Sequence, residues 1–373
     1  MRVNSSQDFR YMKSALRLAA KGRGTTSPNP MVGAIVVNRG RVVGQGYHLR
    51  SGLPHAEVLA LAEAGAKACG GTLYVTLEPC CHREKRTAPC VPAIIGSGVK
   101  RVVIAQRDPN PLVNGRGAAA LRRSGRTVVM GVGGREAEAL NEAYSHWMRT
   151  KHPYVILKAG MTLDGQIATS SGEAKWITNK RSRAESHRLR TDVDAILVGV
   201  GTVLSDDPSL SARVGEKLTR LATKQPLRVV ADSRLRTPLN ARILHHADGA
   251  RTMIATTSAA PAARRRLLER RGAEVVLLPP LRGRVSLPAL MRELGKRGIT
   301  SLLVEGGGEI NAAMLRAKLV QRVRLYVAPS LLGGIDAKGF IGGKSPTRLA
   351  AALKLKHICV RTLGGDLVIE GEL

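Results

Sequence analysis

Short apolar runs alternate with amphipathic stretches along the first 150 residues. Residues 7–21 have the apolar spacing of a helix, whereas Met31 to Val37 and Val42 to Gly46 flank an Asn38–Gly40 turn and predict a strand pair. Further helices are expected at 58–68, 91–96, 118–124 and 136–150, and strands at 72–77, 100–105 and 127–130. Such alternation predicts a layered α/β domain.

The pattern starts afresh after the break at Lys151–His152–Pro153, which places a domain boundary near residue 150. Strands are expected at 154–159, 195–200, 227–231, 252–256, 273–278, 301–304 and 324–328, mostly separated by helices or loops. A chain of 373 residues also exceeds the size of one ordinary core. We therefore expect two domains, 1–150 and 151–373, both of α/β type.

The charge of the chain is strongly positive, with 59 Lys and Arg against 28 Asp and Glu and a net charge of +31. A nucleic-acid partner is one interpretation of such a balance. The basic residues are dispersed, however, and the densest run, Arg264 to Arg271, lies on the exterior of an expected helix. Aromatic residues make up only 3% of the chain, which leaves few platforms for stacked bases. We expect phosphorylated small molecules as partners, and no nucleic acid.

No segment predicts a membrane span or an export signal. The longest apolar run, 194–204, has about half the length that a bilayer requires, and the N-terminus lacks the continuous apolar segment of a secretory signal. The five cysteines form no regular disulfide framework, so a reducing, cytoplasmic location is expected. In that compartment clustered cysteines are metal ligands or catalysts more often than disulfide partners.

Three cysteines and two histidines gather in the motifs HAE (55–57) and EPCCHREKRTAPC (78–90). His55 follows a proline at the expected start of a helix, and Cys80 and Cys90 each lie at the junction of predicted elements. One imidazole and two thiolates would leave a fourth zinc position for water, whose pKa a bound zinc lowers toward neutrality. Glu57, close to the ligands without being one, would then transfer protons, as in zinc nucleobase deaminases.

The alternative is a structural zinc site with four protein ligands, in which His55 or His82 joins Cys80, Cys81 and Cys90. Adjacent cysteines chelate one ion poorly, and a structural site would give Glu57 no role. We expect Cys81 to be a neighbour of the site. The remaining cysteines, Cys69 and Cys359, are expected to be small buried residues.

In the second half, Lys158 interrupts an apolar strand, where a charge normally needs a partner or a role. A predicted strand, ILVGVGTVL (196–204), leads into the polar loop SDDPSLSAR (205–213), and VEGGGEINAAML (304–315) runs from a strand through glycines into a helix. Such a turn suits phosphate oxygens, although glycine turns and Asp206–Asp207 before a proline also occur for structural reasons. Arg234 and Arg236 at a strand end suit the 2′-phosphate of NADP.

Together these segments resemble the bifunctional deaminase–reductase family of riboflavin biosynthesis. In the first half the resemblance lies in TSPNPMVGAIVV (26–37), GYH (46–48), HAE, TLYVTLEPCCH (72–82), RTAPC (86–90) and QRDPNP (106–111). In the second half it adds LKAGMTLDGQIATSSGEAKWIT (157–178) to the motifs above, so that it covers nearly the whole chain. It implies a cytidine-deaminase-like three-layer α/β/α domain followed by a dihydrofolate-reductase-like α/β domain.

The resemblance also assigns site residues. It implies one zinc per chain bound by His55, Cys80 and Cys90, with Glu57 in proton transfer and Asn29 and His48 lining the pocket. It implies NADPH contacts at Gly160, Trp176, Thr202, Asp206, Ser233, Gly307, Gly308, Glu309, Ile310, Asn311, Ala312 and Ala313. Contacts to a phosphorylated substrate fall on Ala174, Arg190, Leu210, Arg213 and Glu305. Two departures are visible: Ala174 stands where the family often has serine, and the stretch from Cys80 to Cys90 is one residue longer than usual.

The implied activities are zinc-dependent hydrolytic deamination of 2,5-diamino-6-(5-phosphoribosylamino)pyrimidin-4-one and NADPH-dependent reduction of its ribosyl group to ribityl. In the second reaction we expect Lys158 to orient or protonate the sugar oxygen and Glu305 to hold the substrate. The family resemblance also implies a homo-oligomer, either a dimer or a tetramer. The alternatives are a tRNA-type nucleic-acid deaminase with an accessory domain, a non-catalytic basic zinc protein, and a family member with one inactive domain.

Overall fold

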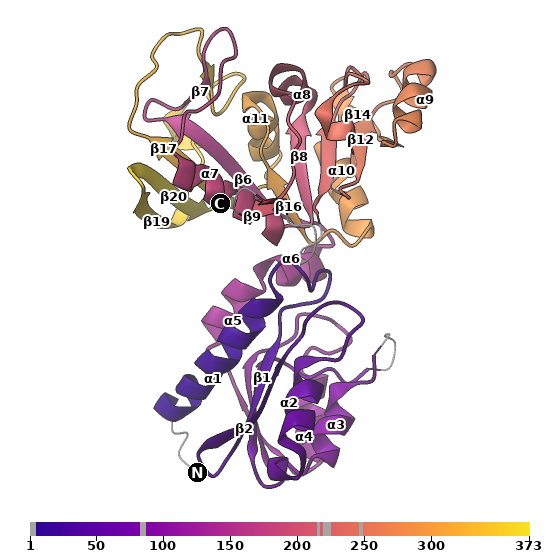
Figure 1. Cartoon of the computed structure of the whole chain (residues 1–373), viewed down its shortest axis with the longest axis vertical. Helices are drawn as coiled ribbons and strands as arrows, with labels where there is room; N and C mark the ends of the chain where they lie inside the picture. Colours follow the sequence, from indigo (N-terminus) through magenta and orange to yellow (C-terminus); the bar gives the residue numbers. More distant parts are fainter. Residues whose placement is uncertain (1–4, 83–86, 215–216, 219–224, 246–248) are drawn as a thin grey trace. The chain divides into compact units, whose positions relative to one another are not determined.

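The computed structural model describes residues 5–82, 87–214, 217–218, 225–245 and 249–373 (Figure 1). The chain forms two compact units, residues 1–151 and 152–373, so the division falls next to the Lys151–His152–Pro153 break. Among the helices in these ranges, none has the length and apolar character that crossing a membrane requires.

The first unit is built on a five-stranded sheet in the order β2-β1-β3-β4-β5 (Figure 1). β1 pairs antiparallel with β2 and β3, whereas β3, β4 and β5 are parallel. The strands are β1 (Gly33–Asn38), β2 (Arg41–Tyr47), β3 (Thr72–Leu77), β4 (Arg101–Gln106) and β5 (Thr127–Met130). The helices are α1 (Ser5–Ala19), α2 (Ala56–Ala64), α3 (Cys90–Gly96), α4 (Arg116–Arg123), α5 (Gly134–Leu140) and α6 (Glu142–Thr150), with 3₁₀ turns at Ala20–Gly22 and Gly65–Ala68.

Alternation along the strands assigns the two faces of this sheet to different helices, because successive side chains of a strand point to opposite sides. Ala34 and Val36 belong to one apolar cluster with residues of α2, α3 and α4. Ile35 and Val37 belong to another, with residues of α1 and α5. The structure therefore has the expected three layers, α/β/α.

The second unit is built on a nine-stranded sheet in the order β13-β12-β11-β8-β16-β6-β17-β20-β19. The strands from β13 to β17 in this order are parallel, and β20 and β19 extend the sheet antiparallel. Their bounds are β6 (Tyr154–Thr162), β8 (Ala195–Gly199), β11 (Leu227–Ala231), β12 (Thr252–Thr256), β13 (Glu274–Leu277), β16 (Ser301–Val304), β17 (Arg322–Ala328), β19 (Lys356–Leu363) and β20 (Asp366–Glu372). Short strands, paired β7 with β18, β9 with β10 and β14 with β15, are β7 (Gln166–Ala168), β9 (Arg213–Val214), β10 (Lys217–Leu218), β14 (Pro280–Leu281), β15 (Arg284–Val285) and β18 (Lys338–Gly339).

Helices cover both faces of the nine-stranded sheet. They are α7 (Lys180–Asp192), α8 (Val200–Asp206), α9 (Ala262–Arg270), α10 (Leu287–Lys296) and α11 (Gly308–Arg316), with 3₁₀ turns at Arg242–Leu244 and Leu349–Ala351. Leu197 lies in a cluster with residues of α10 and α11, whereas its neighbours Ile196 and Val198 lie in a cluster with residues of α7, α8 and α9. The parallel strands are thus buried on both sides, which explains why they read as continuous apolar runs.

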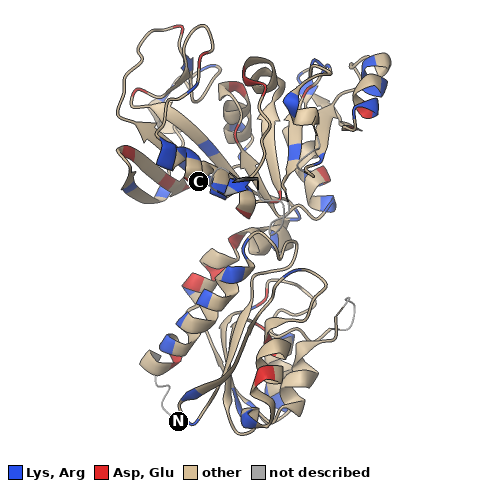
Figure 2. Cartoon of the chain, viewed as in Figure 1, with Lys and Arg blue, Asp and Glu red and all other residues tan. Residues whose placement is uncertain are grey.

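The positive charge is spread over both units (Figure 2). Arg266, Arg270 and Arg271 at the densest basic run are exposed on or next to α9, while Leu268 of the same helix is buried. The run therefore forms a solvated helix face, as its sequence pattern indicates.

Two expected elements differ from the structure. The helix predicted at 136–150 is broken at Asn141, whose backbone departs from helical geometry. The Asn141 side chain accepts from the backbone amide of Met31 and donates to the Met31 carbonyl, at 2.8 and 2.9 Å. The strand predicted at 196–204 ends at Gly199, and α8 begins at Val200. The apolar run continues because one side of α8 packs on the sheet, so its hydrophobicity alone did not mark the change from strand to helix.

The expectation that Cys69 and Cys359 are buried was wrong, because both are exposed. Cys69 lies in the turn before Gly70, and Cys359 lies in β19, an edge strand whose residues are nearly all exposed. The hairpin of β19 and β20 was missed, although Gly364–Gly365 separates its two strands in the sequence.

Asp194 links the starts of β8 and β16 through buried hydrogen bonds. Its buried carboxylate accepts hydrogen bonds from the amide and hydroxyl of Thr300, at 2.9 and 2.7 Å, and from Ser301. Asp194→Ala should lower the free energy of unfolding of the second unit by about 2–4 kcal/mol, because buried donors lose their acceptor. Urea unfolding followed by fluorescence measures the change.

The matched control is Glu269→Ala, which removes an exposed carboxylate paired with Arg265 on α9. An exposed pair of this kind contributes at most about 0.5 kcal/mol. Equal losses in the two variants would contradict the structural role of Asp194.

Candidate functional site

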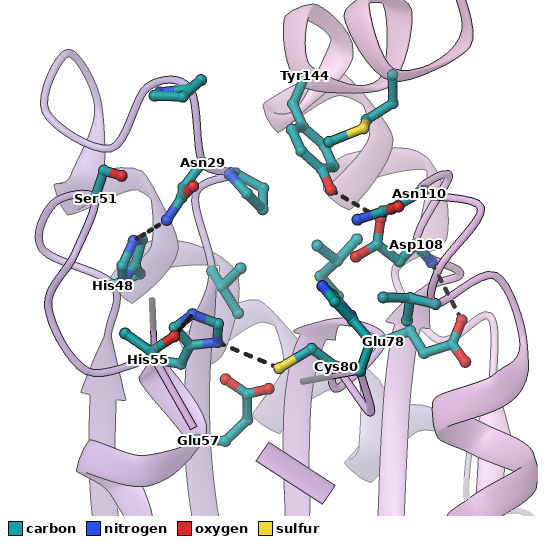
Figure 3. A pocket seen from close by; sticks show the side chains of 18 of the residues that line it. Asn29, His48, Ser51, His55, Glu57, Glu78, Cys80, Asp108, Asn110 and Tyr144 are labelled. Carbon is teal, nitrogen blue, oxygen red and sulfur yellow. Dashed lines mark hydrogen bonds between the residues drawn. The ribbon is translucent and has the colours of Figure 1, made fainter. Parts of the chain in front are cut away.

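Three turns of the first unit bring His55, Cys80 and Cys90 together at one end of the sheet. Figure 3 shows two of them, His55 and Cys80, facing each other. His55 is the residue that precedes α2, Cys80 follows β3 by three residues, and Cys90 is the first residue of α3. The amides of Cys90 and Val91 donate to the carbonyl of Cys80, at 3.1 and 3.2 Å, and so close the loop between the cysteines. Both cysteines are buried.

The distances among the three side chains fit a tetrahedral zinc ion. His55 Nδ1 lies 3.6 Å from Cys80 Sγ and 3.2 Å from Cys90 Sγ, and the three ligand atoms lie within 4.8 Å of one another. With Zn–S of about 2.3 Å and Zn–N of about 2.0 Å, tetrahedral geometry places nitrogen and sulfur about 3.5 Å apart. One nitrogen and two sulfurs are a donor set that zinc prefers, and together they make three ligands.

The other nitrogen of His55 has its own partner. Nε2 lies 3.1 Å from the hydroxyl of Thr87, so Nδ1 is the nitrogen that faces the sulfur atoms. A partner of this kind fixes the orientation of a metal-binding imidazole. Thr87 belongs to the RTAPC motif, but nothing in the sequence indicated that its hydroxyl would reach His55.

Glu57 lies on the first turn of α2 with its carboxylate beside the three ligand atoms (Figure 3). Burial raises the pKa of this carboxyl group, and Cys80 raises it further, while His55 acts in the opposite direction. In the predicted role Glu57 must both take up and release a proton. A raised pKa brings a carboxyl group closer to the range in which it does both near neutral pH.

A pocket of about 510 Å³ opens over these residues. On one side Asn29 Nδ2 lies 3.1 Å from His48 Nε2, and His48 Nδ1 lies 3.2 Å from the carbonyl of Pro54. Since a carbonyl only accepts, His48 donates from Nδ1 and accepts from Asn29 at Nε2. Ser51 also lines this side of the pocket. The structure thus places Asn29 and His48 in the pocket with His55.

The opposite side of the pocket carries residues that the sequence analysis did not single out. Tyr144 on α6 donates a hydrogen bond of 2.9 Å to the buried carboxylate of Asp108, and Asn110 lies beside them (Figure 3). Burial raises the pKa of Asp108 to about 6, against the hydrogen bonds from Asn110 and Tyr144. Asp108 and Asn110 lie in the QRDPNP motif, whose two polar side chains after a strand were an available signal. Tyr144 gave no signal.

Glu78 fixes the loop that carries Asp108. Its buried carboxylate accepts from the amides of Asp108, Gly115 and Ala118 at 3.3, 2.9 and 3.0 Å, at the start of α4, where a negative charge is favourable. Gly117 of α4 is so close to the turn that carries Cys80 that an added Cβ would lie 2.0 Å from the Pro79 carbonyl oxygen. The Cys80 turn and the opposite wall of the pocket are therefore held together.

The residues of the structural alternative lie differently. His82 lines the pocket, and Cys81 has its Sγ 3.9 Å from the carbonyl of Leu112. Neither belongs to the ligand group of His55, Cys80 and Cys90, as far as the described residues show. The longer stretch between the cysteines includes residues 83–86, which lie outside the described residues.

In the second unit Lys158, Arg190 and Glu305 meet beside the central strands. Lys158 lies on β6, Glu305 follows the neighbouring strand β16, and Arg190 lies near the end of α7. Arg190 donates to both carboxylate oxygens of Glu305, at 2.8 and 2.7 Å, and also to the carbonyl of Ser211. Burial alone would raise the pKa of Glu305, but Arg190 and Lys158 hold it at about 2. Glu305 is therefore ionised, and Arg190 occupies both of its oxygens.

Lys158 is also affected by its surroundings. Burial lowers the pKa of its ammonium group, Glu305 acts in the opposite direction, and Arg190 lowers it further.

Two of the other predicted substrate residues lie along the segment after α8. Leu210 is buried with a φ of 51°, and Arg213 in β9 is partly buried. Ala174 is partly buried in the loop before α7.

The glycine turn that was predicted to bind the cofactor packs against β8 and α8. The amide of Gly307 donates to Thr202 Oγ1 at 3.1 Å, and a Cβ added at Gly199 would lie 2.7 Å from Ile310. A Cβ added at Gly306 would lie 2.7 Å from the Cα of Val198, so only glycine permits this approach. The remaining members of the turn, Gly308, Glu309, Asn311, Ala312 and Ala313, form the first turns of α11.

Four further predicted cofactor residues lie on other elements. Gly160 lies on β6, and an added Cβ would contact Thr178 at 3.2 Å. Trp176 is 71% exposed, with Arg183 4.3 Å from its ring centre. Asp206 ends α8, where burial raises its pKa against Lys175 and Lys338. Ser233 follows β11 and accepts from the amide of Val285.

Two family profiles match the chain. Residues 5–106 match the cytidine and deoxycytidylate deaminase zinc-binding region, and residues 153–369 match the RibD C-terminal domain. These matches confirm the expected fold class, a cytidine-deaminase-like unit followed by a reductase unit. They also support zinc binding in the first unit, where the His/Cys/Cys group lies.

Known proteins match over nearly the full length. The riboflavin biosynthesis protein RibD of Actinobacillus pleuropneumoniae is 43% identical over 97% of this chain and 94% of its own, and that of Escherichia coli K12 is 42% identical over 97% and 98%. The structure of Acinetobacter baumannii RibD superposes with a TM-score of 0.89 at 36% identity, covering 99% of this chain and 100% of the other. The Thermotoga maritima diaminohydroxyphosphoribosylaminopyrimidine deaminase/5-amino-6-(5-phosphoribosylamino)uracil reductase gives 0.86 at 34% identity, covering 99% of both chains. The chain therefore belongs to the RibD family of riboflavin-biosynthesis proteins, the family that its motifs resemble.

Proposed function

We propose that this chain is a bifunctional enzyme of riboflavin biosynthesis, with a zinc-dependent deaminase in residues 1–150 and an NADPH-dependent reductase in residues 151–373. The observation that carries the proposal is the His55, Cys80 and Cys90 group beside Glu57, in a chain whose second unit is the reductase of the same family. The Thermotoga maritima relative is named for the same two activities, a deaminase and a reductase.

The deaminase substrate in this proposal is 2,5-diamino-6-(5-phosphoribosylamino)pyrimidin-4-one. Zinc, when bound, supplies a water of near-neutral pKa as the nucleophile for C2 of the ring. Glu57 would carry one proton from the nucleophile to a ring nitrogen. It would then carry a second proton, from the hydroxyl group added at C2, to the amino group, which leaves as ammonia as the C2 carbonyl forms. Asn29, Asp108 and Asn110 offer hydrogen-bonding groups around the pocket that would orient the pyrimidine.

The reductase converts the ribosyl group of the deaminated product to ribityl, with hydride supplied by NADPH at C1′ as the sugar ring opens. Lys158 would donate a proton to the sugar oxygen. Its lowered pKa, which makes the ammonium a better acid near neutrality, supports this role. Glu305 holds Arg190 through both of its oxygens, so we propose that it acts on the substrate through Arg190, instead of by the direct grip expected from the sequence.

NADPH binding is proposed at the turn from Gly307 to Ala313 with Thr202, since glycines, a helix start and a hydroxyl converge there. Gly160, Trp176, Asp206 and Ser233 are proposed as further contacts on the family resemblance. We also propose, on the family resemblance, that the protein is a cytoplasmic homo-oligomer. Its proposed partners are phosphorylated small molecules and not nucleic acid, because the basic residues are dispersed and aromatic residues are scarce.

The two activities can be separated in one assay. With the diaminopyrimidine ribotide and NADPH, the protein should release ammonia and form NADP⁺. A chelator should stop ammonia release, whereas NADPH oxidation on the already deaminated ribotide should continue, because the proposed zinc ligands all lie in the first unit. Ammonia without NADP⁺ would identify an inactive reductase. Loss of NADPH oxidation on the deaminated ribotide in the presence of chelator would contradict the assignment of zinc to deamination alone.

Replacement of Glu57 tests its role as a proton carrier. Glu57→Gln should lower the deaminase kcat by about 100-fold or more, since proton transfer by a positioned side chain contributes about 10²–10⁴. Bound zinc, measured by atomic absorption, should stay at one per chain. Glu63→Gln, on the exposed side of α2, is the matched control and should leave both values unchanged. Loss of zinc in Glu57→Gln would show that Glu57 is a ligand.

Replacement of Lys158 tests the reductase assignment. Lys158→Met keeps most of the length of the side chain and removes its ammonium group, so the reductase kcat should fall by about 100-fold. Ammonia release and the Kd for NADPH should be unchanged. The control is Lys296→Met at the exposed end of α10. An unchanged reductase kcat would reject the proposed role of Lys158.

A further inference from the structure

The ammonium group of Lys158 lies in a buried site without a direct ionic partner. Both oxygens of Glu305 accept from Arg190, and the Lys158 ammonium donates no hydrogen bond to any of the described residues. Burial lowers the pKa of this group, Glu305 raises it, and Arg190 lowers it further. The contact that the ammonium does make is with an aromatic ring.

That ring belongs to Tyr326. Lys158 Nζ lies over it, 5.9 Å from the ring centre. Lys158 is on β6 and Tyr326 is on the neighbouring strand β17, where Arg324 is opposite Lys158 and Tyr326 is opposite Gly160. Tyr326 is thus the diagonal neighbour of Lys158 on the same face of the sheet, a separation that long and aromatic side chains span. Since Gly160 has no side chain, it leaves space between the ring and Lys158.

Two features fix the ring in place. The Tyr326 side chain is buried, and its hydroxyl donates a hydrogen bond of 3.1 Å to Glu185 on α7. Glu185 in turn accepts from Arg361 of β19. Burial raises the pKa of Tyr326 to about 12, so the hydroxyl keeps its proton near neutral pH and remains a donor to Glu185. Tyr326 is therefore a fixed aromatic surface and not a second acid.

The face of an aromatic ring attracts a cation through the ring quadrupole, and more strongly where water is excluded. A neutral amine gains little from the same contact, so the ring favours the ammonium form of Lys158. Arg324, the like charge next to Lys158, is paired with Glu370 of β20 at 2.9 Å. The charged and titratable groups around the contact are Glu305 after β16, Arg324 of β17, Glu370 of β20, Arg361 of β19, and Glu185, His187 and Arg190 of α7.

We propose that Tyr326 is a positioning residue of the reductase unit, whose ring holds the Lys158 ammonium charged and in place for proton donation to the sugar oxygen. The assignment rests on the proposed function, in which Lys158 is the acid, and adds the residue that keeps it one. The ring opposes burial and Arg190, which both lower the pKa of Lys158. Without the ring, Lys158 would lose its proton at lower pH.

The test is the pH dependence of the reductase kcat in the full-length protein, with the deaminated ribotide and NADPH. Lys158 donates only while it is protonated, so kcat falls on the alkaline side as the proton is lost. Tyr326→Leu removes the ring and should move this alkaline limb to lower pH by roughly 0.5–1 pH unit, a roughly 3- to 10-fold loss of kcat above the limb. Tyr326→Phe keeps the ring and should leave the limb in place. The KM for the ribotide and the Kd for NADPH should be unchanged in both variants.

A second comparison does not depend on how well the fold tolerates leucine. Replacement of Tyr326 by a trifluorinated phenylalanine keeps nearly the size of phenylalanine and removes most of the negative charge from the ring face. The alkaline limb should then move as in Tyr326→Leu, with Tyr326→Phe as the reference.

Acetylation of Lys158 by acetic anhydride measures the same proton loss without turnover, because only the neutral amine reacts. Its rate, followed by peptide mass spectrometry across the pH range, should show the same displacement in the same variants.

The matched control is Tyr154→Leu. Tyr154 at the start of β6 has Arg322 5.9 Å from its ring centre, so this variant removes a similar contact from the same sheet. It reports the effect of lost packing and should leave both pH profiles unchanged.

The proposal is overturned if Tyr326→Leu and the fluorinated variant keep the pH profiles of the unaltered protein. It is also overturned if Tyr326→Phe moves the profiles as far as Tyr326→Leu, because the hydroxyl would then be the acting group, or if Tyr154→Leu moves them equally. Failure of the unaltered protein to oxidise NADPH with the deaminated ribotide would reject the proposed function. Normal turnover with unmoved acetylation profiles would reject only the role of Tyr326.

Discussion

The catalytic chemistry proposed for the first unit depends on the closure of the loop between Cys80 and Cys90. Two backbone amides at the start of α3 donate to the Cys80 carbonyl, and this brings two sulfur atoms to the same side of one imidazole. His55 is fixed in turn by its position before α2 and by Thr87 at its far nitrogen. Backbone geometry thus sets the separations of the ligand atoms, and these separations suit a tetrahedral ion with a fourth position for solvent.

Both units place their polar groups where strands end and helices begin. Glu57 and the proposed zinc ligands lie at such junctions in the first unit. In the second unit, Glu305 and the glycine turn before α11 lie at one. An isolated buried charge would be unfavourable, and neighbouring groups offset this cost in each unit. Glu78 accepts hydrogen bonds from three backbone amides, and Glu305 is paired with Arg190.

The layered fold could be predicted from the sequence, because strands buried on both faces leave apolar runs. The grouping of His55, Cys80 and Cys90 could be predicted as well, because metal ligands must be specific residue types. The sequence did not reveal groups that act through tertiary contacts. Tyr144 of α6 donates to Asp108, and Asn141 separates α6 from α5, whereas the sequence pattern predicted one helix over 136–150. The pairing of Arg190 with both oxygens of Glu305 could not be predicted either, since the two residues are 115 positions apart in the sequence. The burial predicted for Cys69 and Cys359 failed because general residue preferences do not identify a turn or an edge strand.

The central claim is that His55, Cys80 and Cys90 bind zinc and leave one position open to solvent. X-ray absorption at the zinc edge of the purified protein tests it directly. The account predicts two sulfur neighbours at about 2.3 Å and two lighter neighbours at about 2.0 Å, one from imidazole and one from water that a small anion displaces. A third sulfur neighbour, a second imidazole, or a coordination sphere that no added anion alters would contradict it.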